Sequence, residues 1–158
     1  MKSILYTIAF FALTLFSSCT HNNGDIGELF GTWKLQSITI NNEIDTTYQN
    51  DIFWKYQASV TSMIKVNDDT HDFSDVWGTW RYVNDGSAIE FDYTHSDNDN
   101  IQGSFKYSPL PETHLPSNSI FIMDVQELND SHMTLRYLSE NDSSLISEYI
   151  YKFKKWAQ

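Results

Sequence analysis

The sequence predicts an all-β fold, an antiparallel up-and-down β-barrel of about eight strands, and three observations support it. Stretches rich in β-branched and aromatic residues alternate with short turns of Asn, Asp and Ser. No segment shows a helical pattern longer than two turns, and strands do not alternate with helices as they do in parallel sheets. Aromatic residues make up 15% of the chain and can build a core of large rings without disulfides. Closure into a barrel removes the exposed edges of such a sheet.

The first strand is predicted over residues 31–40. Its apolar residues change parity between Leu35 and Ile38, which indicates a bulge or a strand end there. Residues 42–58 show no clear pattern, and we expect a short helix or an irregular crossing. Trp54 belongs to no clear strand in this stretch, and we expect it near the mouth of the barrel.

The other strands are predicted from alternating apolar residues and from the turns that separate them. In the clearest case Ile89, Phe91 and Tyr93 share one face while acidic side chains occupy the other, which is typical of a half-buried antiparallel strand. Residues 84–87 (NDGS) provide a hairpin turn with a glycine for positive φ. The predicted strands after the first are 59–66, 77–83, 88–94, a weak one at 103–107, 119–128, 132–138 and 146–153.

The N-terminus resembles the signal peptide of a bacterial lipoprotein. A basic start is followed by about 13 apolar residues, too few for the roughly 20 of a membrane-spanning helix. Ser17 and Ser18 then precede Cys19, and Phe16 stands where the lipobox of these proteins usually has Leu. Cys19 is the only cysteine, so it has no partner for an intrachain disulfide. The alternative is a plain secretory signal with an incidental cysteine, but acylation removes a reactive thiol and is favoured.

This resemblance divides the chain into three parts. We expect a signal peptide over residues 1–18, a tether over 19–28 and a barrel domain over 29–156. Fatty acids such as palmitate on Cys19 would then attach the protein to the membrane, because two or three acyl chains hold where one is marginal. Thr20 after the cysteine favours the outer membrane, by resemblance to the enterobacterial sorting rule. The expected location is therefore the cell envelope, with the leaflet left open.

Charge limits the partners of the whole chain. It carries 21 acidic and 10 basic side chains, and loss of residues 1–18 removes only one lysine. Nucleic acid is not expected as a partner, because phosphate binding needs clustered Lys and Arg. The same acidic excess argues against electrostatic docking to anionic lipid head groups. It is well suited to keeping a tethered domain soluble, and we expect a monomer.

Three motifs resemble the lipocalin-like lipoproteins of Bacteroides-type bacteria. Residues 29–35 (LFGTWKL) are similar to their G-x-W entry into the first strand, and residues 78–80 (GTW) to their middle strands. Residues 127–135 followed by 151–155 (YKFKK) resemble their closing hairpin and last strand. The resemblance covers about residues 29–156 and implies a β-barrel or half-open sandwich with an apolar interior. The disulfides of true lipocalins are missing, and no helix is evident before the last strand.

The interior of such a barrel is either filled by side chains or holds one small ligand. We expect Trp33 and Trp80 to pack in the core rather than to contact a ligand, because large aromatic residues on strands are usually buried. The buried hydroxyl groups of tyrosines would need partners and would suit an amphipathic ligand. The candidate interior residues, selected by parity, are Tyr82, Phe91, Met123, Leu135, Tyr137, Tyr149 and Tyr151.

Neither catalysis nor a cofactor is expected. The chain has no cysteine nucleophile within the domain, no G-x-S-x-G motif and no Gly-rich phosphate loop. Residues 97–100 (DNDN) begin like a calcium loop but lack its later ligands, so no metal is expected there. A second acidic cluster is most simply interpreted as a solvated loop, although the cluster could hold a cation loosely. Its members are Asp68, Asp69, His71, Asp72 and Asp75.

The sequence therefore predicts a membrane-anchored lipoprotein with a lipocalin-like barrel that binds a small hydrophobic or amphipathic molecule. The alternative is a protein-interaction or inhibitory module that acts through the barrel loops, since loops on a rigid scaffold often carry function. An enzyme with an unmarked site is a third hypothesis. An open pocket of at least about 300 Å³ lined by the candidate interior residues favours the ligand, and a solid interior with an apolar patch on the loop ends favours a protein partner.

Overall fold

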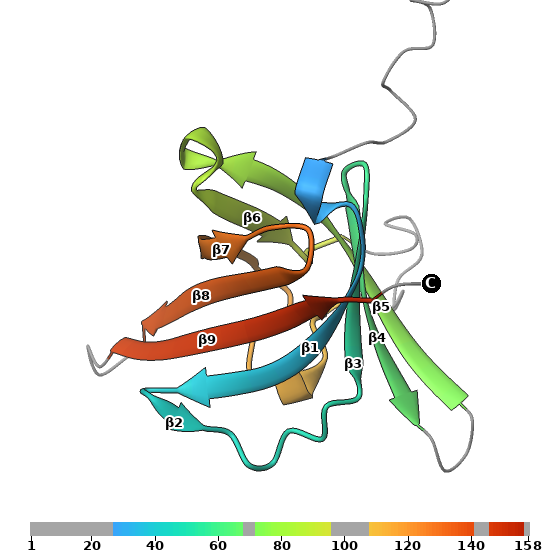
Figure 1. Cartoon of the computed structure of the whole chain (residues 1–158), viewed down its shortest axis with the longest axis vertical. Helices are drawn as coiled ribbons and strands as arrows, with labels where there is room; N and C mark the ends of the chain where they lie inside the picture. The colour runs from blue at the N-terminus through green and yellow to red at the C-terminus, as the bar shows by residue number, and fades with distance from the viewer. Residues whose placement is uncertain (1–26, 68–71, 96–107, 141–145, 157–158) are drawn as a thin grey trace, which may run out of the picture.

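The computed structural model describes residues 27–67, 72–95, 108–140 and 146–156, and this part of the chain is all-β (Figure 1). Its helices are three single 3-10 turns, and no described helix is long and apolar enough to cross a membrane. The strands are β1 Gly31–Ile40, β2 Glu43–Ile44, β3 Ile52–Gln57, β4 Val60–Asn67, β5 Asp72–Val83, β6 Ala88–Asp92, β7 Ile120–Leu128, β8 His132–Glu140 and β9 Ile146–Lys155. The 3-10 turns are η1 Gly27–Leu29, η2 Asn84–Gly86 and η3 Pro111–Thr113.

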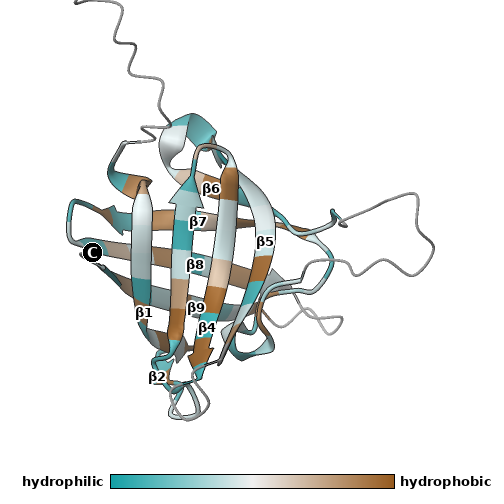
Figure 2. Ribbon diagram, turned by 90° about the vertical axis from the view of Figure 1, so that its right-hand side faces the viewer, coloured by the Kyte–Doolittle hydropathy of each residue, from teal (hydrophilic) through white to brown (hydrophobic). Residues whose placement is uncertain are grey.

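The sheet closes on itself through its first and last strands. β1 pairs along one edge with β3 and along the other with β9, and all the strand pairs are antiparallel. Two-residue β2 pairs only with the end of β1, so β1 and β3–β9 form an eight-stranded barrel. In Figure 2 strands β6–β9 cross behind β1, β4 and β5, so two walls face each other across one core. The predicted antiparallel barrel is confirmed.

The predicted bulge in the first strand is confirmed, because the pairing of β1 with β9 shifts register between Leu35 and Ser37. The expectation for residues 42–58 was wrong, since this stretch contains β2 and β3. The alternation of β3 is interrupted by one apolar residue on its outer face. Phe53 lies on the outer face and packs edge-to-face on Trp156, with 5.3 Å between the ring centroids. The weak strand predicted at 103–107 lies outside the described residues.

One end of the barrel is closed by the chain that enters it. η1 lies at this end (Figure 1). The Trp33 indole donates a hydrogen bond of 2.9 Å to the Leu29 carbonyl. Lys155 lies 4.3 Å above the centroid of the Trp33 ring. Gly31 has φ of +112°, and an added Cβ would approach the Lys155 side chain at 3.3 Å. Trp33 is fully buried, so the expectation that it packs in the core is confirmed.

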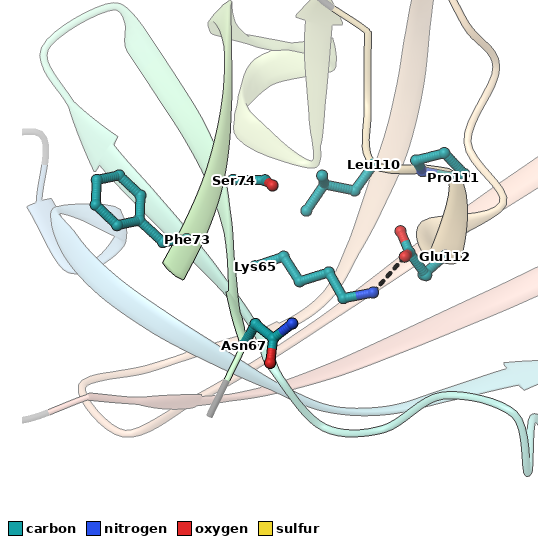
Figure 3. A pocket seen from close by; sticks show the side chains of 7 residues that line it. All are labelled: Lys65, Asn67, Phe73, Ser74, Leu110, Pro111 and Glu112. Atoms are coloured by element: carbon teal, nitrogen blue, oxygen red, sulfur yellow. Dashed lines mark hydrogen bonds and ion pairs between the residues drawn. The ribbon is translucent and has the colours of Figure 1, made fainter. Parts of the chain in front are cut away.

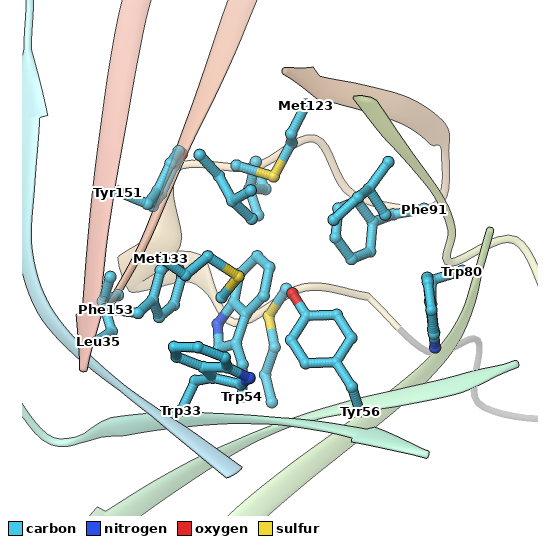
Figure 4. Close-up of a cluster of buried hydrophobic side chains, with 14 of the residues drawn as sticks. Trp33, Leu35, Trp54, Tyr56, Trp80, Phe91, Met123, Met133, Tyr151 and Phe153 are labelled. Atoms are coloured by element: carbon cyan, nitrogen blue, oxygen red, sulfur yellow. The ribbon is translucent and has the colours of Figure 1, made fainter. Parts of the chain in front are cut away.

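Trp54 occupies the centre of the core and not the mouth as expected. Its ring contacts rings from strands on the opposite side of the barrel, at 5.6 Å from Phe91 and 6.4 Å from Tyr151 (Figure 4). The Phe153 and Tyr56 rings lie 5.1 and 6.3 Å away. β3 points Trp54 inward because Ile52, Trp54 and Tyr56 alternate with outward side chains. Aromatic contacts therefore cross the barrel from wall to wall.

We expect Trp54→Ala to lower the free energy of unfolding by about 3–5 kcal/mol, because the substitution leaves a cavity among several rings. Trp77→Ala is the matched control, since Trp77 is 38% exposed on the outer face of β5 and should cost less than about 1 kcal/mol. Urea unfolding followed by circular dichroism measures both. Equal losses in the two variants would contradict the central position of Trp54.

Candidate functional site at the barrel mouth

The mouth of the barrel, opposite η1, is covered by residues 108–119, the described segment that leads into β7 (Figure 1). Within this segment Leu110 and Leu115 point into the core, and Thr113 in η3 is fully buried. The Tyr151 hydroxyl donates a hydrogen bond of 2.8 Å from the barrel interior to the Thr113 carbonyl. We call residues 110–115 the mouth turn.

An ion pair and a histidine–carboxylate hydrogen bond fasten the mouth turn to the rim. The Lys65 ammonium contacts the Glu112 carboxylate, and Asp51 lies 3.7 Å from the same ammonium. The hydrogen bond with Glu112 raises the pKa of Lys65, and Lys65 in turn lowers the pKa of Glu112. On the other side of the turn, His114 Nε2 lies 2.8 Å from Asp45 Oδ2, and the His114 ring stacks on Tyr149. The turn is therefore held from both walls.

Asp45 is prepared to accept this contact. Hydrogen bonds from the Thr47 side chain, then from His114, lower the pKa of Asp45 from 3.8 to about 2, against the opposing effect of burial. The Thr47 backbone N–H donates to Asp45 Oδ1 at 2.8 Å. Asp45 thus remains an acceptor for His114 at every pH above the titration range of ordinary carboxylates.

A cleft of about 480 Å³ opens beside the mouth turn. Figure 3 shows Lys65 crossing it toward Glu112, with Leu110 and Pro111 on the side of the turn. Phe73, on β5, lies on the side of the cleft away from the mouth turn and is highly exposed. The lining residues are Lys65, Asn67, Phe73, Ser74, Leu110, Pro111 and Glu112.

None of the seven candidate interior residues lines this cleft. Tyr137 and Tyr149 are partly buried near the mouth, with ring centroids 6.0 Å apart. Tyr82 lies far from them beside the β5–β6 turn and is 40% exposed. The remaining four are fully buried in the ring-packed core: Phe91, Met123, Leu135 and Tyr151.

Sequence reasoning missed polar atoms that are buried without partners. The Trp54 indole N–H and the Tyr56 hydroxyl have no hydrogen-bond partner among the described residues, and the Trp80 indole N–H is in the same state. The Tyr56 hydroxyl points to the middle of the cluster (Figure 4). Burial raises the pKa of Tyr56, so the phenol stays protonated and can donate. The signal was hidden because two of these residues belong to unpredicted β3.

The predicted lipid anchor and most of the acidic cluster fall on residues that the structure does not describe. Cys19, Asp68, Asp69 and His71 lie outside the described residues. Within the described ranges, no group of His, Cys, Asp and Glu side chains is arranged to hold a metal ion.

The sequence profile of the lipocalin-like domain family matches residues 14–143. The chain belongs to this family. The lipocalin-like part of the predicted resemblance is confirmed, while the origin in a Bacteroides-type lipoprotein stays a prediction. In this lipocalin-like protein β9, the strand that closes the barrel, lies beyond the matched range. No curated protein sequence matches the chain.

Solved structures of similar shape include bovine odorant binding protein complexed with its natural ligand, at 12% identity and a TM-score of 0.46. The match covers 84% of this lipocalin-like chain and 74% of the bovine protein. Lobster apocrustacyanin A1 matches at 10% identity and a TM-score of 0.48, covering 87% of this chain and 66% of the lobster protein. The complex of the bovine protein with undecanal matches at 12% identity, a TM-score of 0.46 and the same coverages of 84% and 74%.

The contact between Asp45 and the mouth turn predicts a pH dependence. Because its pKa is lowered on folding, Asp45 stabilises the folded state above about pH 4, and this contribution is lost as the pH falls toward 2. The difference in unfolding free energy between the wild type and Asp45→Asn should therefore shrink over that range. Urea unfolding at several pH values measures it, with Asp130→Asn at the closed end as control. A difference that stays constant between pH 5 and pH 2 would contradict this role.

Proposed function

We propose that this protein binds a small amphipathic molecule that enters its barrel at the mouth, beneath the mouth turn. The observation that carries the proposal is the pair of unpartnered donors in the interior, the Trp54 indole N–H and the Tyr56 hydroxyl. A buried donor without a partner costs about 1–3 kcal/mol, and native proteins rarely retain several together without a reason. Acceptor groups on an amphipathic molecule would satisfy these donors, and the surrounding rings would form its apolar wall.

Access requires the mouth turn to move and the rings beneath it to repack around the ligand, because buried side chains fill the described interior. The ion pair of Glu112 with Lys65 is partly exposed, and such pairs are typically worth about 0–1 kcal/mol. His114 adds one further contact, with the largely buried Asp45 side chain. Leu110 and Leu115 would leave the core at the same time. Opening the wall would instead break the continuous ladder of backbone hydrogen bonds between paired strands. Local opening at the mouth is therefore the least costly route into the barrel.

The proposal places the protein in the cell envelope, as a monomeric lipoprotein acylated at Cys19 and held in the outer membrane. The signal-like residues 1–18 and the position of the single cysteine support this location. The assigned role is that of a binding protein and not of an enzyme.

A second candidate function is a protein-interaction module, and one observation favours it. Ile120, Ile122 and Leu138 are 56%, 46% and 43% exposed on neighbouring strands β7 and β8. Exposed aliphatic side chains that gather on a sheet face suit a protein partner.

Native mass spectrometry of the mature protein purified from membranes tests both parts of the proposal. The intact mass should include fatty acyl chains on Cys19, and the native spectrum should show a bound molecule that organic extraction removes. An unmodified N-terminus would overturn the anchor. Absence of any bound molecule, together with no binding of added cis-parinaric acid, would overturn the ligand and favour the interaction module.

The same fluorescent fatty acid tests the donors. We expect Tyr56→Phe to weaken binding of cis-parinaric acid roughly tenfold, because one hydrogen bond to its carboxylate is lost. Tyr82→Phe is the matched control and should leave the affinity unchanged, since Tyr82 lies outside the interior. Fluorescence titration gives the dissociation constants. Equal affinities of the two variants would contradict entry of the carboxylate into the barrel.

A further inference from the structure

Basic side chains gather on one side of this acidic protein. Five of the ten basic residues lie on the adjacent strands β9, β1 and β3, although the chain has a net charge of −11. The net charge of the whole chain argued against binding to anionic lipid head groups. Net charge does not show, however, that basic residues are concentrated on one side of the protein. The five residues are Lys34, Lys55, Lys152, Lys154 and Lys155, and we call them with Phe30, Phe53 and Trp156 the basic face.

Four of the five lysines of the basic face have no acidic partner in the part of the chain that the structure describes. Lys34 and Lys154 are directly paired in the register of β1 and β9, where like charges destabilise a sheet. No ion pair of Lys34, Lys55, Lys152 or Lys154 is found among the described residues, whereas Arg81 and Arg136 on other strands each contact a carboxylate. The fold retains the repulsion between Lys34 and Lys154, and no described carboxylate pairs with either lysine. This arrangement indicates an external anionic surface.

Aromatic side chains lie among these lysines. The Lys34 ammonium is 5.6 Å from the Phe53 centroid and 5.7 Å from the Trp156 centroid. Phe30 and Trp156 are 44% and 49% exposed, and both line a cleft of about 390 Å³ together with Lys55 and Lys155. Exposed Trp and Phe beside Lys is the composition of surfaces that lie at the membrane–water interface.

The basic face adjoins the end at which the tether joins the barrel. Lys155 Nζ donates a hydrogen bond of 2.6 Å to the Glu28 carbonyl, and the Phe30 N–H donates one of 3.1 Å to the Gly27 carbonyl. Only eight residue steps separate Cys19 from Gly27, and a fully extended chain of that length spans at most about 29 Å. An acylated Cys19 would keep this end of the barrel within that distance of the bilayer.

We propose that the basic face docks on the anionic lipid head groups of the membrane that holds the anchor. This docking rests on the proposed acylation of Cys19. The lysines contact head-group phosphates, and Trp156 and Phe30 enter the interfacial layer. The mouth lies at the opposite end from η1, so docking keeps the mouth turn accessible from the aqueous side.

Fluorescence quenching tests the docking in the mature acylated protein. The protein is reconstituted into phosphatidylcholine vesicles with or without phosphatidylglycerol, in which the acyl chains are brominated. We expect tryptophan quenching that needs phosphatidylglycerol, is lost at high salt and is absent in Trp156→Phe. Trp77→Phe should retain it, because Trp77 lies on β5 outside the basic face.

A charge reversal separates docking from loss of fold. Lys154→Glu should weaken docking roughly thirtyfold, at about 1 kcal/mol for each of the two charges changed. It should not lower the thermal stability, because it relieves the repulsion with Lys34. Arg81→Glu makes the same change of net charge on β5 and should leave the quenching unchanged.

Two results would overturn the proposal in different ways. Acylated protein whose Trp156 is not quenched, or is quenched equally without phosphatidylglycerol, would exclude docking and leave the anchor intact. An intact mass without acyl chains would exclude the anchor, and the docking with it. If Lys154→Glu and Arg81→Glu weakened the quenching equally, the cause would be the net charge of the protein and not the basic face. That result would also exclude the proposal.

Discussion

The contact of Trp54 with rings from the opposite wall is the interaction on which this structure depends. A single cysteine offers no internal disulfide, so the barrel must be held by its core and by the pairing of β1 with β9. Trp54 joins β3 to β6 and β9 through Phe91, Tyr151 and Phe153. These contacts fill the middle of the barrel. The polar groups that could contact the proposed ligand therefore lie at the mouth and at the buried donors beside the rings.

The two ends of the barrel have different designs. The closed end is fixed by Trp33, which is hydrogen-bonded to η1 and covered by Lys155. The mouth is covered by a short turn. This turn is held by two buried leucines, a hydrogen bond from one tyrosine hydroxyl and a partly exposed ion pair. Stability is thus distributed unevenly, and the proposed ligand would enter past the element with the weakest contacts. A docked closed end and a movable mouth would together give the tethered barrel a defined orientation.

Much of the fold was predictable because period-two patterns report burial directly. The strand containing Ile89, Phe91 and Tyr93 alternates cleanly, and the bulge after Leu35 is visible as a change of parity. β3 was not predictable, since Phe53 is apolar and faces outward to pack on Trp156, a partner about a hundred residues away. The candidate site was even harder to predict from the sequence. Parity separates inward from outward side chains, but it does not show that Tyr82 lies at the closed end or that Glu112 returns to Lys65.

The central claim is that the interior of the unliganded barrel is filled by rings meeting around Trp54. Nuclear Overhauser effects in the mature protein, with the Trp54 indole assigned through a Trp54→Phe spectrum, test this claim most directly. The structure predicts cross-peaks from the Trp54 ring protons to those of both Phe91 and Tyr151, whose centroids lie 5.6 and 6.4 Å away. Cross-peaks to residues of β3 and β4 alone, with none to β6 or β9, would mean an open lumen and would contradict the account.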